Sequence, residues 1–122
     1  MFDHIGFAVR DLAKTREFYT AALEPLGFST RFERDGLVAF GRPGRPQLWF
    51  YARDGAPTGV HIALEAETRA QVDAFHAAAL AAGGTDNGAP GLRPQYRPTY
   101  YGAFVFYPDG HNLEAVCHAA EA

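Results

Sequence analysis

The sequence predicts an α+β fold made of two tandem βαβββ modules, residues 1–56 and 57–122, within a single domain. The first observation is an internal repeat with a spacing of 57 residues, which indicates a duplicated supersecondary unit. The second is that each copy passes from alternating apolar and polar residues, typical of a strand, to apolar residues at helical spacing. Identical residues at the repeat spacing include His4 and His61, Phe18 and Phe75, and Gly27 and Gly84.

In the first module, the alternation over residues 2–9 predicts a half-buried strand. Asp11 can cap a helix over residues 12–23, and Pro25 with Gly27 ends it. Turn signals then separate three short strands, which we expect at residues 28–33, 37–40 and 47–51. The apolar stripe that predicts the packed face of the helix is Leu12, Phe18, Tyr19, Ala22 and Leu23.

The second module repeats this plan, with a strand at residues 60–65 and a helix that begins with a capping box of Thr68 and Gln71. Gly83 and Gly84 end the helix. Two further strands are expected at residues 100–107 and 112–117, and the remaining strand near 84–87 or inside the following loop. The apolar stripe of the helix is Val72, Phe75, Ala79 and Leu80.

Residues 86–98 are rich in glycine and proline, and they predict a loop of about 13 residues, which is long for a compact domain. Loops of this length are often functional, so Arg93 and Arg97 are candidates for holding an anionic substrate. The alternative is a proline-stiffened connection with solvated arginines. Further candidates for lining a substrate pocket are Trp49, Tyr51, Tyr100 and Tyr101, although aromatic strand residues often simply pack.

Composition excludes several classes of function. The net charge of -3 gives no electrostatic reason to expect nucleic acid or an anionic membrane as partner. No apolar run approaches 18 residues, so no membrane span is expected, and the strand-like start predicts no signal peptide. The single Cys117 excludes an internal disulfide and favours the cytoplasm; we expect it to be a buried, inert thiol.

The alternation of each strand predicts which side chains share a face. Opposite the apolar faces, beside small residues that leave room for a cavity, we expect His4, His61, Glu114 and Gln47. Two imidazoles and a carboxylate suit Fe(II), Mn, Co, Ni or Zn, with open positions for a substrate. The alternative is that the histidines are polar residues on an exposed sheet face. His76, His111 and His118 are not expected to belong to a site.

Three segments carry a resemblance to a known family: the opening residues 4–12, the pair Phe18-Tyr19, and residues 109–114, where an Asp-Gly turn leads to Glu114. The chain resembles the vicinal oxygen chelate superfamily, which includes glyoxalase I, extradiol dioxygenases, and bleomycin- and fosfomycin-resistance proteins. The resemblance implies that the modules curl into an open, mixed-sheet barrel around a metal, with the helices outside. It implies ligands from the first and last strands of each module, at positions that map to His4, to Gln47 or a neighbouring residue, to His61 and to Glu114.

The resemblance also implies a divalent-metal-dependent enzyme, a lyase or isomerase, that chelates a small substrate through neighbouring oxygens. Glu114 would remain a ligand or detach to move a proton. Glyoxalase I has a second Glu where this chain has Gln47, so the set His4, His61 and Glu114 is closer to the Fe(II) site of extradiol dioxygenases.

Two functions without catalysis also fit the resemblance. One is an antibiotic-binding protein that sequesters a small molecule without turnover, and the other is a structural or regulatory dimer. Open sheet edges and the family pattern predict a homodimer in either case, as they do for the enzyme.

Overall fold

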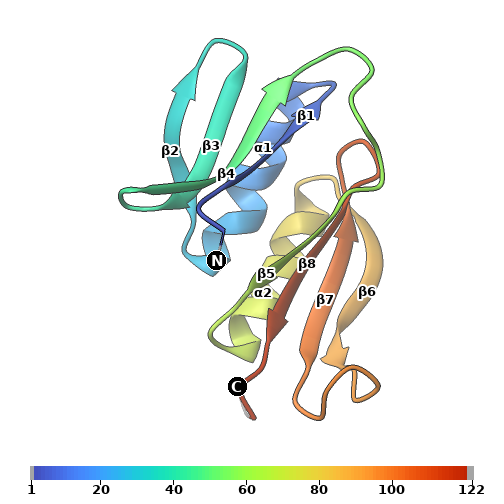
Figure 1. The fold of residues 1–122 in the computed structure, drawn as a ribbon. Helices are drawn as coiled ribbons and strands as arrows, with labels where there is room; N and C mark the ends of the chain where they lie inside the picture. The colour runs from blue at the N-terminus through green and yellow to red at the C-terminus, as the bar shows by residue number, and fades with distance from the viewer. Residues whose placement is uncertain (1, 121–122) are drawn as a thin grey trace.

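The computed structural model describes residues 2–120, and it contains two modules of the same design (Figure 1). The first module contains β1 (Ile5–Val9), α1 (Leu12–Leu23), the 3₁₀ turn η1 (Glu24–Leu26), β2 (Ser29–Arg34), β3 (Leu37–Arg42) and β4 (Arg45–Ala52). The second contains β5 (His61–Glu65), α2 (Arg69–Ala81), β6 (Thr85–Leu92), β7 (Tyr101–Phe106) and β8 (Asn112–Cys117). The predicted α+β class and the repeated βαβββ order are confirmed.

The strands form two four-stranded sheets with equivalent orders, β1-β4-β3-β2 and β5-β8-β7-β6. In each sheet the first strand of the module pairs in parallel with the last, and the other neighbours are antiparallel. The described strands form mixed sheets and no closed barrel. The helices lie together on one side of the two sheets (Figure 1), so one face of each sheet is left without a helix.

Both helices begin where the sequence predicts. Asp11 accepts a hydrogen bond from the backbone N–H of Lys14 (3.0 Å), and Thr68 and Gln71 form the complete capping box of α2. The chain leaves the first helical segment at Gly27, whose φ of 85° lies in the left-handed region that glycine tolerates. Within residues 2–120, no helix has the length and apolar character needed to cross a membrane.

The core lies between the helices and the sheets. Its fully buried members include Phe18 and Tyr19 of α1, Phe50 of β4 and Phe75 of α2. One predicted core residue is wrong: Leu80 is 37% exposed. Consecutive helical residues differ by about 100° around the axis, so Leu80 points away from the face that buries Ala79.

The sixth strand corrects the predicted loop. Strand β6 covers Thr85–Leu92, so most of the loop predicted at residues 86–98 is sheet, and the connection is only 93–100. β6 is an edge strand with register shifts on both sides of Gly88, which explains why it lacks clean alternation. An edge strand also tolerates Pro90, because one side of its backbone needs no partner.

Candidate metal centre

The uncovered face of the second sheet carries a histidine–glutamate pair. Leu113, Ala115 and Cys117 of β8 enter the core, which turns Glu114 to the opposite face, as the alternation predicts. His61 Nε2 lies 2.9 Å from Glu114 Oε1. The Glu114 side chain is 2% exposed and that of His61 is 52% exposed, so the imidazole lies at the mouth of a site whose carboxylate is buried.

The second oxygen of Glu114 also has a partner. The Tyr100 hydroxyl donates a hydrogen bond to Glu114 Oε2, so each carboxylate oxygen contacts a different side chain. Desolvation, and then the hydrogen bond to Glu114, raise the pKa of Tyr100 to about 12. Tyr100 is therefore a hydroxyl donor over the physiological pH range.

The uncovered face of the first sheet is built differently. His4 precedes β1 and its side chain is 57% exposed, with Nδ1 2.7 Å from Asp3 Oδ1. The hydrogen bond and charge of His4 lower the pKa of Asp3. The His4 ring lies 5.7 Å from the Trp49 ring, measured between centroids. No group of three His, Cys, Asp or Glu side chains with the placement of a metal site forms within residues 2–120, so one chain does not gather His4 with His61 and Glu114.

The strand register identifies the counterpart of Glu114 in the first module. Ala63 of β5 pairs with Glu114 of β8, and Gly6 of β1 pairs with Trp49 of β4. Because Gly6 and Ala63 are equivalent in the repeat, Trp49 occupies the position where the second module has its carboxylate. Its indole Nε1 donates to the Pro46 carbonyl (2.7 Å), which fixes the ring.

Gln47, the expected fourth ligand, lies two residues before this position on β4, where the pairing with β3 shifts register. It lines an apolar cavity of about 180 Å³ at the junction of the modules. Residues from both modules line this cavity, among them His4, Ile5, Gln47, Ile62, Ala63 and Leu64. Gln47 is therefore close to the His4 half of the site, in a different sheet from Glu114.

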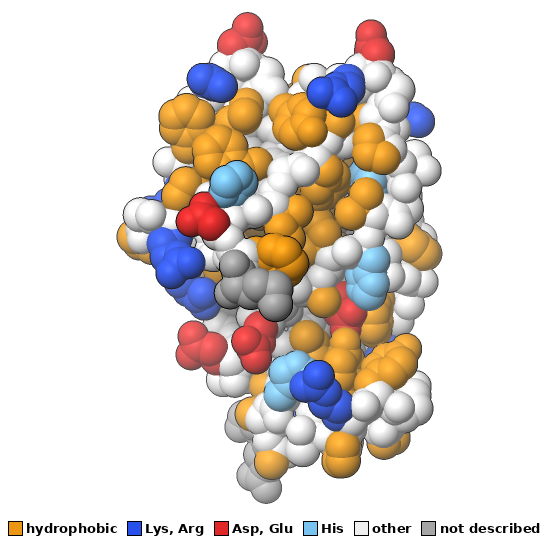
Figure 2. Space-filling view, in the orientation of Figure 1, with side chains coloured by type: hydrophobic (Ala, Val, Ile, Leu, Met, Phe, Trp, Pro, Cys, Tyr) orange, Lys and Arg blue, Asp and Glu red, His pale blue; other side chains and the backbone are white. Residues whose placement is uncertain are grey.

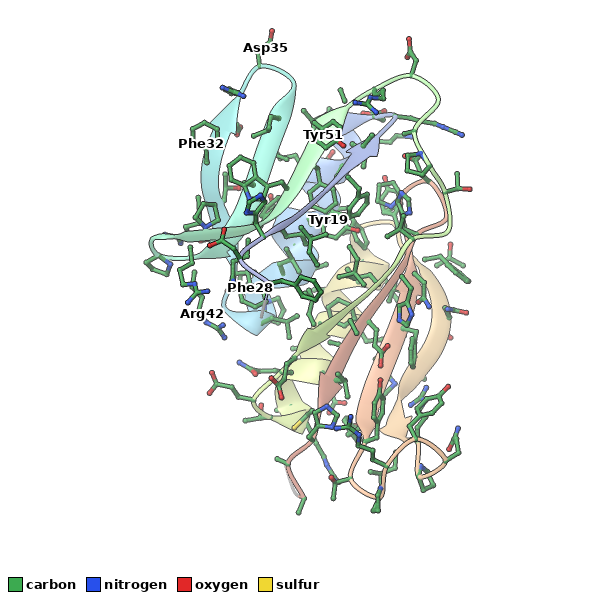
Figure 3. All side chains as sticks on the ribbon, viewed as in Figure 1. Tyr19, Phe28, Phe32, Asp35, Arg42 and Tyr51 are labelled. Carbon is green, nitrogen blue, oxygen red and sulfur yellow. The ribbon has the colours of Figure 1, made fainter. Side chains whose placement is uncertain are left out.

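The remaining predicted substrate-binding residues separate into two groups. Tyr51 lies on the same face as Trp49, and a β-carbon at Gly6 would contact both side chains. Figure 3 shows Tyr51 on β4 and Phe32 on β2. The Phe32 ring lies 5.7 Å from the Trp49 ring, measured between centroids. Aromatic side chains therefore surround Trp49, the ring that lies beside His4.

The second group lies around the 93–100 connection. The Arg93 guanidinium donates to three backbone carbonyls, those of Ala89, Gly91 and Gly102, so it braces β6. Arg97 is exposed. The Tyr101 hydroxyl donates to Asp73 of α2 (2.6 Å), which turns this side chain to the helix side of the sheet and away from Glu114.

Histidines outside the predicted set have structural contacts. His76 Nε2 lies 2.9 Å from Asp86 Oδ1. His111 is 1% exposed, its Nδ1 accepts from the Val60 N–H (3.1 Å), and its ring packs edge-on against Phe7. No local pattern predicts this burial, because His111 belongs to a Gly-containing turn that is typical of exposed chain. Cys117 is buried, as predicted.

The His61–Glu114 pair fits a divalent metal on its donor chemistry. Imidazole nitrogen and carboxylate oxygen are ligands of Fe(II), Mn, Co, Ni and Zn. The 2.9 Å separation of the two donor atoms is that of neighbouring ligands around one octahedral ion, roughly 3.0 Å for bonds of about 2.1 Å. Figure 2 shows histidines on the same side of the molecule as exposed hydrophobic surface over both modules.

Several solved structures share this fold over nearly the whole chain. A glyoxalase/bleomycin resistance protein from Albidiferax ferrireducens T118 is 29% identical, with a TM-score of 0.84 over 98% of this chain and 99% of that chain. A glyoxalase/bleomycin resistance protein/dioxygenase family enzyme from Burkholderia phytofirmans PsJN is 17% identical, with a TM-score of 0.74 over 96% of this chain and 98% of that chain. At 17% identity, the similarity to the Burkholderia phytofirmans structure shows only that the fold is shared.

No curated protein sequence matches the chain. A family model described as the Glyoxalase/Bleomycin resistance protein/Dioxygenase superfamily matches residues 1–115, which is most of the chain. Together with two βαβββ modules of the same strand order, this match identifies the chain as a member of the glyoxalase/bleomycin resistance protein/dioxygenase superfamily.

Proposed function

We propose that the protein is a divalent-metal-dependent enzyme of the glyoxalase/dioxygenase type, which acts on a small substrate through neighbouring oxygens. The observation that carries this proposal is Glu114, a buried carboxylate on the helix-free face of its sheet, 2.9 Å from the accessible imidazole of His61. A buried carboxylate is costly unless it is paired, and pairing with a half-exposed imidazole leaves one side open to solvent.

The proposed ligands are His61 and Glu114 from one chain and His4 from a second copy. One chain does not bring His4 to the pair within residues 2–120, so a homodimer in which the first sheet of one copy faces the second sheet of its partner would complete the set. The fourth protein position is Trp49 rather than a carboxylate, and Gln47 remains a weaker candidate beside His4.

The bound metal would polarise the substrate oxygens and stabilise a developing oxyanion or enolate. The chain's own residues would supply the pocket. Trp49 and Tyr51 would form an aromatic wall beside His4, and Arg97 is the better candidate for an anionic substrate group because Arg93 is committed to backbone carbonyls.

A second candidate is an Fe(II) extradiol-type dioxygenase. The observation that favours it is that Trp49 occupies the position equivalent to Glu114, where a second carboxylate would otherwise lie. The remaining donors are two histidines and one carboxylate, the set typical of non-haem Fe(II) oxygenases. Oxygen uptake with a panel of catechols, compared with turnover of methylglyoxal plus a thiol, separates the two reactions. A non-catalytic binding protein would turn over neither, and its ligand binding would be insensitive to chelators.

Metal analysis tests the site. After reconstitution with divalent metals, the wild type should retain metal, and His4→Ala, His61→Ala and Glu114→Ala should each lose it. A wild type that retains no divalent metal contradicts the proposal.

Mixing two inactive variants tests whether the site is shared. If His4 comes from a second copy, a mixture of His4→Ala and Glu114→Ala chains forms heterodimers with one intact site each. Random exchange should then recover about a quarter of the wild-type metal content. If all ligands come from one chain, the mixture recovers none. The metal content of each variant measured alone provides the baseline.

A further inference from the structure

We propose that Tyr100 is a positioning residue for Glu114: it holds Oε2, so that Glu114 offers only Oε1 beside His61 and stays fixed as a ligand. This inference rests on the proposed function and deepens it, because it decides between the two roles open to Glu114, permanent ligand or mobile base. In this proposal the 93–100 connection, which ends at Tyr100, holds the tyrosine in place.

The environment of Glu114 supports this role. An ionised carboxylate only accepts hydrogen bonds, and at 2% exposure its two oxygens depend on protein donors. His61 and Tyr100 approach different oxygens, so they do not compete. Rotation of the carboxylate out of the pair would leave the Tyr100 hydroxyl without its acceptor, and a group held in this way is a poor mobile base.

The Tyr100 hydroxyl is itself held by the 93–100 connection. The Tyr100 carbonyl accepts from the Arg93 N–H (2.7 Å), and its N–H donates to the Arg97 carbonyl (3.1 Å). The ring packs edge-on against His118 at 5.4 Å, and the neighbouring Thr99 hydroxyl donates to the His118 carbonyl (2.8 Å). Backbone and ring contacts therefore fix the direction of the hydroxyl before any ligand binds.

Gly102 provides independent evidence that the Tyr100–Glu114 contact needs space. A β-carbon at this position would lie 3.2 Å from Tyr100 Cε1 and 3.5 Å from Glu114 Oε2. Gly102 is not among the glycines with a positive φ, so its backbone conformation does not require glycine. A side chain at this position would crowd the Tyr100 ring, so its absence leaves room for the ring beside Glu114.

The Tyr100 hydroxyl donates to Glu114 Oε2, and His61 lies beside Oε1. Since Glu114 is held on both oxygens, the group that moves a proton during turnover has to be another one. This consequence distinguishes the site from one in which a ligand carboxylate swings off to act as the base.

The test compares Tyr100→Phe with Tyr101→Phe. Both remove one tyrosine hydroxyl that donates to a carboxylate, but the Tyr101 partner is Asp73 on the helix side. We expect Tyr100→Phe to weaken Co²⁺ binding, measured by chelator competition, by about 10- to 100-fold. Its Co²⁺-loaded visible spectrum should also change, because the carboxylate is free to bind through both oxygens. Tyr101→Phe should leave affinity and spectrum unchanged.

The outcomes separate this inference from the proposed function. If the wild type binds Co²⁺ and Tyr100→Phe binds it with the same affinity and spectrum, the positioning role is overturned while the metal site stands. If the wild type binds no Co²⁺, the proposed function fails and the role of Tyr100 fails with it. Circular dichroism of each variant shows that it is folded; if Tyr100→Phe unfolds, Gly102→Ala, which keeps the hydroxyl but crowds it, should weaken binding in its place, and unchanged binding there overturns the role.

Discussion

The two modules share a backbone plan but present different chemistry on their helix-free faces. In the second module a buried carboxylate, Glu114, contacts an imidazole and a tyrosine hydroxyl. In the first, the equivalent position is Trp49, and the nearby His4 is mostly solvated with Asp3 as its partner. The strand pairing has been kept in both copies, while the side chains that face the site have diverged. One module therefore presents a buried carboxylate beside an imidazole, and the other presents aromatic side chains.

The largest expected effects test whether the two modules contribute equally to the core. Phe18 of α1 and Phe75 of α2 occupy the same repeat position, and both are fully buried. Phe18→Ala and Phe75→Ala should each lower the free energy of unfolding by about 3–5 kcal/mol, because each leaves a cavity. Urea denaturation measures the loss, with Leu80→Ala as an exposed helical control. A loss of less than about 1 kcal/mol at either phenylalanine would show that the two modules do not contribute equally to the core.

The next effect tests the difference at the site. Trp49→Glu places a carboxylate at the position equivalent to Glu114, so it should tighten binding of a divalent metal on the order of tenfold, since affinity rises with ligand charge. Gln47→Glu, two residues earlier on the same strand, is the matched control and should change affinity less. Chelator competition measures both. If only Gln47→Glu tightens binding, the position equivalent to Glu114 in the site is Gln47 and not Trp49.

Helix capping provides a smaller test of the same comparison. Asp11→Ala and Thr68→Ala each remove the side chain that accepts from the first turn of a helix. We expect each to lower the free energy of unfolding by about 1 kcal/mol. Thermal unfolding by circular dichroism measures the change. Equal stability of wild type and both variants would argue that the caps contribute nothing in either module.

The smallest expected effect concerns the joint between the modules, where His111 packs against Phe7 of β1. Burial lowers the pKa of His111 in the folded state, an effect that Asp109 partly opposes. The unfolded chain therefore binds a proton first, near pH 6.5, so the stability contributed by His111 is complete above that pH and declines as the pH falls below it. His111→Gln should show a smaller loss of stability than wild type between about pH 7.5 and 5 in urea denaturation. An equal loss in both would exclude His111 as the source.

The regular parts of the fold are predictable from the sequence because local signals agree there. The Asp11 and Thr68 caps, the helical stripes apart from Leu80, and the alternation of β8 each act within a few residues, and the structure confirms them. β6 is only partly predictable, since its glycines, proline and shifted register hide the strand pattern until the edge of a sheet supports it. The pairing of Glu114 with Tyr100 depends on three-dimensional packing and carries no local signal. The exposure of Leu80 follows from its position about 100° from Ala79 around the helix axis.

The site is predictable only in part, because local patterns give the face on which a side chain lies but not its partners across the sheet. Face geometry brings His61 and Glu114 together, and the structure places them in contact. Face geometry does not reveal that Trp49 is the counterpart of Glu114, because the 57-residue spacing holds only up to Gly84, after which the second module follows a longer path. Pairing between strands, and not distance along the chain, defines that equivalence.

Trp49 is the only tryptophan in the chain, and its ring lies 5.7 Å from that of His4. The indole emission of the whole protein therefore comes from one point on one half of the proposed site. A paramagnetic ion that binds at His4, or an aromatic molecule that stacks on the wall, would quench or shift that emission directly. The protein thus carries its own optical reporter, and a ligand library can be screened against the unlabelled chain.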